Sequence, residues 1–328
     1  MKLAIVILNW NGQKLLETFL PSVVRYTKMH DIYVIDNGST DTSVAFLEAH
    51  YPSIKCVKLT HNMGYAGGYN AGLKLIDADV FCLLNSDVEV TKNWLKPIIE
   101  AFRTNPNTAI IQPKILDYHN KNKFEYAGAG GGFIDQLGYP YCRGRIFDTI
   151  EDDHGQYNDQ KNIFWASGAC LFIRANAFKS LNGFDNSFFA HMEEIDLCWR
   201  AQNKNMTVTY VGNSTVYHAG AQSLQTSNPK KTYLNFRNSL YTLVKNTQNP
   251  VGFVVFLRLT LDGLAGIRFL LQGRPKHMIA IIKAHGRFYQ ALPSLLKFRR
   301  QHSKKTHNQL KSIVWSYFVC NKKNYNNL

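Results

Sequence analysis

Acidic residues are almost absent from the last third of the sequence. The 328 residues contain 38 Lys and Arg against 23 Asp and Glu, for a formal net charge of +15. Residues 225–328 hold 18 of these Lys and Arg and a single acid, Asp262, whereas residues 1–224 hold 20 basic and 22 acidic residues. A near-neutral body followed by a basic, apolar tail is typical of proteins that bind an anionic membrane surface. The alternative is a basic region whose charge only keeps it soluble.

The sequence also lacks paired cysteines, a long apolar run and a nucleic-acid-binding motif. The nearest candidate for a membrane-spanning helix, 251–271, is broken by Arg258, Asp262 and Arg268. The six cysteines form no C-x-x-C pair, and several stand in apolar runs, so we expect buried thiols and a reducing compartment. Without a recognisable motif in the basic tail, we expect no nucleic-acid partner. Since no signal peptide follows Lys2, we expect a cytoplasmic protein, peripheral on the cytoplasmic face of the plasma membrane.

The first 115 residues alternate apolar, strand-like runs with helix-like segments. Such alternation predicts an α/β fold with a doubly wound, mostly parallel sheet. The expected strands are 3–8, 32–35, 56–59, 80–84 and 109–111, and the expected helices are 15–24, 44–47, 67–76 and 94–102. In a sheet of this kind, ligands bind beyond the carboxyl ends of the strands.

A polar cluster follows each of the first four strands, which predicts a pocket at that edge of the sheet. The clusters are 9–12, 36–41, 61–64 and 85–87. No G-x-G-x-x-G follows the first strand and no P-loop motif occurs, so a bound diphosphate needs another source of positive charge. Asp87 with Mg²⁺ or Mn²⁺ is suited to that task. Asp36 could accept a hydrogen bond from a base or ribose, and a capping or Asx-turn role is its alternative.

Eight short stretches follow one another along about two-thirds of the chain: 5–11 (IVILNWN), 34–41 (VIDNGSTD), 62–70 (NMGYAGGYN), 83–87 (LLNSD), 167–169 (SGA), 183–185 (GFD), 193–200 (EEIDLCWR) and 216–220 (VYHAG). In this order, they resemble the family 2 glycosyltransferases of the GT-A fold. The likeness is greatest to bacterial rhamnosyltransferase-like members that build cell-surface polysaccharides.

The resemblance implies a donor site with a divalent metal. Asp36 would contact the nucleotide base, with Asn9 and Asn11 near the same subsite. Asn85, Ser86 and Asp87 occupy the place of the family's D-x-D signature; since Asn85 replaces the first acid, only Asp87 supplies charge.

His218 matches a position that supplies a further metal ligand in some relatives, and a packed, hydrogen-bonded histidine is the alternative. Asn62, Gly64 and Asn70 would shape the wall around the donor, or else serve turn and helix-start geometry.

Glu193 and Glu194 match the acidic pair from which the family draws its catalytic base. Glu194 aligns with the usual aspartate and is the expected base for transfer with inversion, with Glu193 and Asp196 in reserve. The alternative is acids that favour a helix start. We expect Asp196 and Arg200 to support the helix surface as an (i, i+4) pair.

The resemblance and the tail together divide the chain. Residues 1–225 would form the catalytic domain, with a nucleotide-sugar half at 1–115 and an acceptor half at 116–225. Residues 226–328 would form a basic helical extension that associates with the membrane. Its helices are expected at 229–247, 250–272 and 275–300, and a cap packed on the catalytic domain is the alternative.

The expected function is transfer of a sugar from a dTDP- or UDP-linked donor to a hydroxyl of a glycan or polyprenyl-linked acceptor. A non-catalytic nucleotide-sugar-binding partner in a polysaccharide assembly complex is the alternative. Trp165 and Trp199 have apolar neighbours, so we expect them in the core rather than stacked on a sugar.

Overall fold

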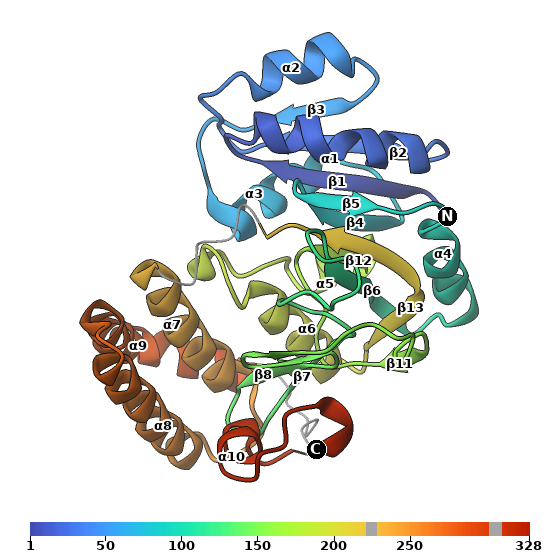
Figure 1. The fold of residues 1–328 in the computed structure, drawn as a ribbon. Coiled ribbons are helices and arrows are strands. Elements are labelled where there is room, and N and C mark those ends of the chain that lie inside the picture. The colour runs from blue at the N-terminus through green and yellow to red at the C-terminus, as the bar shows by residue number, and fades with distance from the viewer. Residues whose placement is uncertain (221–227, 302–309) are drawn as a thin grey trace.

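The computed structural model describes residues 1–220, 228–301 and 310–328, with residues 300 and 301 described by their backbone only. The expected domain boundary at 225/226 lies in 221–227, outside the described residues. Figure 1 shows a central sheet covered by helices, with the C-terminal helices at one edge of the molecule.

The central sheet is built mainly from the first half of the chain. Its strands are β1 (Leu3–Asn9), β2 (Asp31–Asp36), β3 (Lys55–Lys58), β4 (Val80–Asn85), β5 (Val88–Val90), β6 (Thr108–Asp117), β11 (Gln160–Asn162), β12 (Cys170–Arg174) and β13 (Thr207–His218). The order is β11-β13-β6-β12-β4-β1-β2-β3, and β5 pairs with β13. The strands predicted from the sequence are β1 to β4 and β6.

The sheet is mostly parallel, as predicted. β1 pairs in parallel with β2 and β4, and β2 with β3. β12 is antiparallel to both β4 and β6 and separates them, so β6 keeps the direction of β4. The GT-A class expected from the sequence is consistent with this arrangement.

Each face of the sheet has its own hydrophobic core. Along β1, Leu3, Ile5 and Ile7 pack with α1, α2 and α4, whereas Ala4 and Val6 pack with α3, α5 and α6. These helices are α1 (Gln13–Tyr26), α2 (Ser43–His50), α3 (Gly64–Gly72), α4 (Leu95–Thr104), α5 (Ala175–Ser180) and α6 (Glu193–Asn203), with 3₁₀ turns at Leu73–Leu75 and Asn186–Phe188. Burial on both sides explains why β1 is an unbroken apolar run.

The segment between β6 and β12 forms a small antiparallel sheet, for which no strand was predicted. Its strands are β7 (Gly132–Ile134), β8 (Pro140–Cys142), β9 (Arg145–Ile146) and β10 (Thr149–Ile150). The short helix α10 (Ile313–Phe318) packs on this sheet and is followed by a 3₁₀ turn at Tyr325–Asn327. The strands have two or three residues each, too few to show a period-2 pattern.

The C-terminal helices are α7 (Pro229–Asn246), α8 (Val251–Leu271) and α9 (Pro275–Gln301), close to the predicted ranges. α7 packs on α6 and α9, and α8 packs mainly on α9. In the part of the chain that the structure describes, no helix is both long and apolar enough to cross a membrane. Cys82, Cys142, Cys170 and Cys198 are buried free thiols, as expected, whereas Cys320 is exposed.

Candidate active site

The carboxyl ends of three neighbouring strands bring the predicted donor residues together. Asn9 and Asp36 are register partners at the ends of β1 and β2, and Asn85 pairs with Leu8 at the end of β4. Because these strands run in parallel, their last residues lie along one edge of the sheet.

The loops after β1 and β2 are joined by side-chain hydrogen bonds. Asn9 Nδ2 donates to Asp36 Oδ1 at 3.2 Å, and the Ser39 N–H donates to Asp36 Oδ2 at 3.0 Å. The Asx-turn alternative for Asp36 is therefore present in the fold. Asn11 Oδ1 accepts from the Thr40 N–H at 2.7 Å. The buried Asn9 Oδ1 has no hydrogen-bond partner among the described residues, so it remains available to a ligand.

Asn62 and Gly64 hold the start of α3 in place, and Asn70 ties the last turn of this helix to Phe184. Asn62 Oδ1 accepts from the Gly64 N–H at 2.8 Å. Gly64 has φ +71°, and a Cβ there would lie 2.6 Å from the Phe189 carbonyl oxygen, so only glycine fits. Asn70 makes hydrogen bonds to both the N–H and the carbonyl of Phe184. The contacts of Asn62 and Gly64 match the turn and helix-start alternative, and direct donor contact by all three residues stays a prediction.

A buried cluster of one imidazole and two carboxylates lies where β13 ends beside β4 and β5. His218 Nε2 lies 3.2 Å from Asp87 Oδ1, and His218 Nδ1 lies 3.2 Å from Glu125 Oε1. Asn85 Nδ2 lies 3.5 Å from the same His218 Nε2. Burial opposes a charged ring, but Glu125 and Asp87 together raise the pKa of His218 to about 10.

Glu125 was not identified from the sequence. It stands alone in the loop after β6, more than ninety positions from its histidine, and no local spacing signals the contact. Glu125 contacts the ring nitrogen of His218 that faces away from Asp87. A carboxylate in this position orients a metal-binding histidine.

Asp87 and His218 fit a divalent ion as part of a ligand set. In residues 1–220, 228–301 and 310–328, no group of three or more His, Cys, Asp or Glu is arranged to hold a metal alone. Asp87 Oδ1 and His218 Nε2 face each other, and a carboxylate and a neutral imidazole are both ligands for Mn²⁺. An ion bound here would have to displace the proton that the two carboxylates otherwise keep on the ring. The remaining ligands of such an ion are usually substrate phosphate oxygens and water. Ser86 Oγ is buried beside them with no partner among the described residues.

Glu193 and Glu194 open α6 as a strongly perturbed pair. The Oε2 atom of each is buried and makes no hydrogen bond within the described part of the chain. Burial raises the pKa of Glu194 to about 7, although the Gly168 N–H that donates to it acts in the opposite direction. Burial and the adjacent Glu194 raise the pKa of Glu193 well above its usual range. Near neutral pH, Glu194 can therefore exchange a proton.

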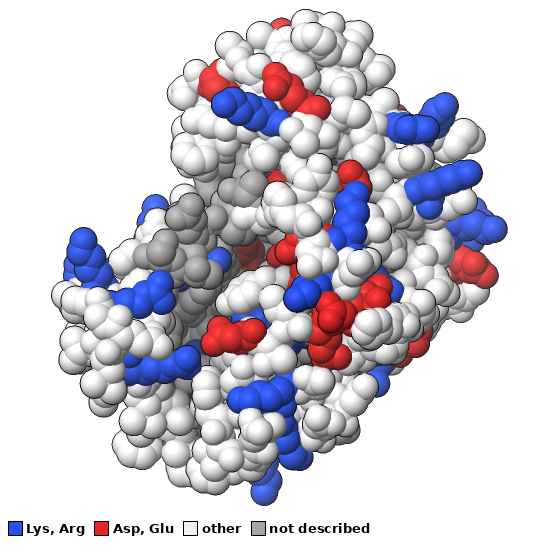
Figure 2. Space-filling view, viewed as in Figure 1, with Lys and Arg blue, Asp and Glu red and all other residues white. Residues whose placement is uncertain are grey.

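The two residues before β12, Gly168 and Ala169, connect this glutamate to the strand-end cluster. The Asn85 N–H donates to the Ala169 carbonyl at 3.0 Å, and the Gly168 N–H donates to the Glu194 carboxylate. Tyr65 Oη donates to the Gly168 carbonyl at 2.8 Å. Asn85 and Glu194 therefore contact adjacent residues of one short segment. Figure 2 shows this face of the molecule hollowed between the N-terminal elements and the C-terminal helices, with acidic side chains gathered near its centre.

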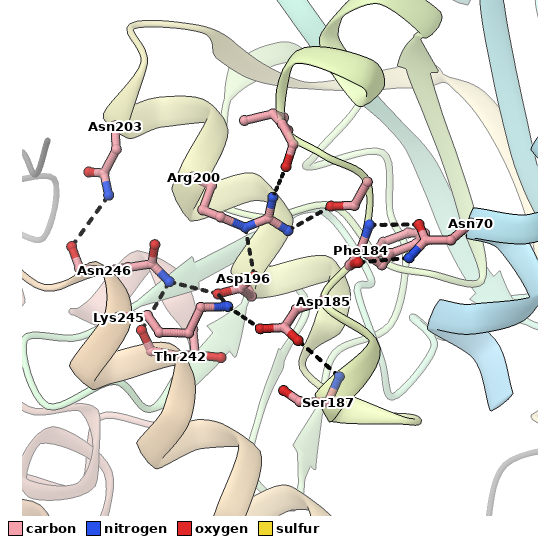
Figure 3. Close-up of polar contacts among 12 residues, drawn as sticks. Asn70, Phe184, Asp185, Ser187, Asp196, Arg200, Asn203, Thr242, Lys245 and Asn246 are labelled. Atoms are coloured by element: carbon pink, nitrogen blue, oxygen red, sulfur yellow. Dashed lines mark hydrogen bonds and ion pairs between the residues drawn. The ribbon is translucent and has the colours of Figure 1, made fainter. Parts of the chain in front are cut away.

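Asp196 lies in a buried ion-pair network, which corrects the expectation that it supports the helix surface. Asp196 is fully buried, and Arg200 Nε donates to its Oδ2 at 2.7 Å. Lys245 Nζ lies 2.8 Å from Asp196 Oδ1 and 2.7 Å from Asp185 Oδ2, and Asn246 Nδ2 donates to Asp196 Oδ1 (Figure 3). The pair was read as surface support because an (i, i+4) spacing does not reveal which face of a helix is covered.

The backbone before α6 is strained and is held by α7. Phe189, His191 and Met192 all have positive φ values, between 64° and 73°, which non-glycine residues rarely adopt. Asn238 Nδ2 of α7 lies 2.7 Å from the His191 carbonyl oxygen and 2.9 Å from that of Ala190. α7 therefore fixes the position from which Glu193 and Glu194 start, a role that its sequence did not indicate.

Trp165 and Trp199 are buried in the core, at 5% and 1% exposure, as expected. Neither is available to stack on a sugar in this conformation. Trp165 Nε1 donates to the Phe133 carbonyl at 2.8 Å, and Trp199 packs edge-on against Phe164.

Comparison with known proteins gives a family match and similar folds. The glycosyl transferase family 2 profile matches residues 4–181. The chain is 26% identical over 239 residues to N-acetylglucosaminyl-diphospho-decaprenol L-rhamnosyltransferase of Mycobacterium tuberculosis, covering 67% of this chain and 77% of the relative. It is 23% identical over 242 residues to low-salt glycan biosynthesis hexosyltransferase Agl10 of Haloferax volcanii, covering 72% and 73%.

Among solved structures, GalNAc-T7 with UDP, GalNAc and Mn²⁺ is similar with a TM-score of 0.64 at 14% identity. The likeness covers 98% of this chain and 57% of that chain. At this level of identity it shows the fold, and the predicted GT-A class is confirmed.

Proposed function

Because the chain belongs to glycosyl transferase family 2, we propose that it moves a hexose from a nucleotide diphosphate to a hydroxyl of a glycan or lipid-linked acceptor, with inversion. One observation carries the mechanism. Glu194, whose pKa is raised to about 7, is hydrogen-bonded to the segment that also contacts the strand-end donor cluster.

The donor lies along the ends of β1, β2 and β4. The nucleotide contacts Asp36, Asn9 and Asn11, and a UDP- or dTDP-linked sugar satisfies the proposal equally. Support comes from the unpartnered, buried Asn9 Oδ1 and from the GT-A neighbour solved with UDP.

Asp87 and His218 would hold Mg²⁺ or Mn²⁺, with the donor's diphosphate supplying further oxygen ligands. When bound, the ion offsets the negative charge that develops on the departing nucleotide diphosphate. The solved neighbour with Mn²⁺ and the facing Asp87 and His218 atoms support this assignment.

The reaction is a single displacement. The acceptor oxygen forms a bond to the anomeric carbon, the bond to the diphosphate oxygen breaks, and the acceptor proton passes to the Glu194 carboxylate. A protonated Glu193 beside it keeps a second negative charge out of the buried site. The strand ends and α6 hold donor and base in fixed positions, which removes much of the entropic cost of the encounter.

We further propose that the enzyme works in cell-surface polysaccharide synthesis, as a peripheral protein at the cytoplasmic face of the plasma membrane. The similarity to N-acetylglucosaminyl-diphospho-decaprenol L-rhamnosyltransferase supports a polyprenyl-linked substrate. The basic C-terminal region supports attraction to anionic lipids.

A thermal-shift screen of UDP- and dTDP-sugars, with and without Mn²⁺, tests the proposal. A donor that binds only the folded state stabilises it by about 2.7 kcal/mol at ~100 times its Kd. We expect an Mn²⁺-dependent shift in the wild type that Asp87→Asn abolishes. Donor hydrolysis in the same samples separates an enzyme from the non-catalytic binding partner, which would show the shift without turnover.

A further inference from the structure

Helix α8 (Val251–Leu271) buries a charged pair beside Val254 on its inner face and exposes large apolar side chains on its outer face. Arg258 and Asp262 are 3% and 0% exposed. Arg258 Nε donates to Asp262 Oδ1 at 2.8 Å, and Tyr139 Oη donates to the same oxygen at 2.8 Å. His285 Nε2 of α9 lies 3.4 Å from the other carboxylate oxygen. A helix that only capped the catalytic domain would bury its apolar face instead.

The outer face of α8 is a continuous apolar stripe. Its exposed residues follow one another at spacings of three and four, and only Thr260 among them is polar: Phe253, Phe256, Thr260, Leu264, Ile267 and Leu271. Phe256 is 67% exposed and Leu271 is 84% exposed. At ~1.5 Å per residue the stripe is about 27 Å long. An apolar surface of this extent on a folded protein marks a site of interaction.

The exposed charges beside the stripe are all positive within the described part of α8, α9 and their connection. They are Arg268, Arg274, Lys276, Lys283, Arg287 and Lys297. Asp262 is the only carboxylate of these two helices, and it faces inward. On α9, Ile279 and Ile282 are also exposed, at 51% and 59%. Figure 1 shows α8 and α9 at the edge of the molecule, away from β1, β2 and β3.

The apolar stripe and the positive charges beside it fit an anionic lipid surface better than a second copy of the chain. A second copy of the chain, paired symmetrically through this face, would bring like charges together. Anionic lipid headgroups attract the Lys and Arg side chains, while the acyl boundary below them accepts the apolar stripe.

We propose that α8 and α9 form a membrane-docking face, with the 253–271 stripe lying in the plane of an anionic lipid surface. The proposal rests on the membrane location proposed above and assigns it to a defined surface. Deleting α8 and α9 would not test it, because α9 also covers α7 and buries Phe288 in the core. Point substitutions on the stripe avoid that damage.

The test is flotation of the full-length protein with vesicles of phosphatidylcholine alone or with phosphatidylglycerol. We expect binding to the anionic vesicles only, weakened by salt. The double variant Phe256→Ser/Leu271→Ser should bind the anionic vesicles at least about tenfold more weakly than the wild type does. The control Met29→Ser/Leu75→Ser removes side chains of similar exposure, 89% and 70%, from the N-terminal half and should bind as the wild type does.

Equal binding by the wild type and Phe256→Ser/Leu271→Ser, or equal binding to both vesicle types, overturns the proposal. Light scattering without lipid tests for a dimer. If the wild type is a dimer and the Phe256→Ser/Leu271→Ser variant is a monomer, the face binds a second copy of the chain, and the proposal is again overturned. Mn²⁺-dependent donor hydrolysis, measured without vesicles, tests the proposed enzymatic function separately. A failure of the membrane-docking proposal can therefore be told from a failure of the proposed function.

Discussion

Two adjacent glutamates in one helix turn differ because their surroundings differ. Burial raises the pKa of both, but the Gly168 N–H stabilises the charged form of Glu194 and limits its rise to about 7. Glu193 experiences burial and the charge of Glu194 together. One carboxyl is thereby set to titrate near neutral pH, as a general base requires.

Replacing Glu194 with Gln should lower turnover by about 10² to 10⁴, because the acceptor proton loses its carboxylate. Donor affinity, measured by calorimetry, should stay unchanged, since the amide keeps the size of the side chain. Glu100→Gln, on the exposed surface of α4, is the matched control. Turnover near the wild-type rate would assign the base to another residue.

The rate of transfer should rise with pH and level off above the pKa of Glu194, about 7. Because that pKa is raised, the deprotonated base is lost as the pH falls through 7 rather than through the ordinary range near 4.5. Turnover at saturating donor from pH 5.5 to 8.5 checks this. A profile that is flat across that range contradicts the assignment.

Glu125→Ala should weaken Mn²⁺ binding about 10- to 100-fold, because His218 loses the carboxylate behind its ring. Electron paramagnetic resonance of free Mn²⁺ measures this without turnover. Glu125→Gln keeps an acceptor oxygen and should recover much of the affinity, whereas Glu89→Gln, whose carboxylate pairs with Lys121, should have no effect. Equal affinity in the Ala variant would leave Glu125 with a packing role only.

At the scale of elements, α7 supports the catalytic helix. Lys245 and Asn246 reach Asp185 and Asp196, and Asn238 lies against the strained turn before Glu193. Three polar side chains of α7 therefore lie in the interface with the elements that set the position of α6.

Lys245→Met should reduce the free energy of unfolding by about 3–5 kcal/mol, because it removes the cation that contacts both the buried Asp196 and the partly exposed Asp185. Urea unfolding followed by circular dichroism measures the change. Lys74→Met, at an exposed position near the end of α3, should change stability by less than about 0.5 kcal/mol. A loss below about 1 kcal/mol would show that Arg200 alone compensates Asp196.

The strands and their polar ends could be predicted from the sequence because burial on both faces gives unbroken apolar runs such as Leu3–Leu8. The order of the sheet could not, since β12 enters between β4 and β6 through long-range pairing that no local period encodes. The supporting role of α7 was missed for the same reason: Lys245 contacts Asp185 across 60 positions. The only local sign of this supporting role is a lysine that directly follows the mostly apolar segment Leu240–Val244.

At the scale of the whole molecule, α7 and the sheet share one hydrophobic core. Leu240, Leu243 and Val244 are fully buried in the same cluster as Val6 and Leu83 of the central strands. The core of the sheet therefore includes residues on both sides of 221–227 and reaches the last turn of α7, whereas α8 contributes few residues to it.

The backbone amides of α7 should accordingly be protected from hydrogen exchange with an opening free energy close to that of global unfolding, on the order of 5–15 kcal/mol. The amides of α8 should have a smaller opening free energy. Mass spectrometry of peptic fragments resolves the two helices. Exchange of α7 as fast as that of α8 would mean that all the C-terminal helices open together as an independent unit.

The ion pair between Asp262 and Arg258 also sets the charge of the outer face of α8 and α9. The Arg258 guanidinium keeps the pKa of this carboxyl low although burial acts against it. Because the one carboxylate of these two helices is enclosed in an ion pair, it adds no negative charge to the surface on which the Lys and Arg side chains are exposed. If this surface meets anionic lipid as proposed, added salt should weaken the attraction by screening those positive charges.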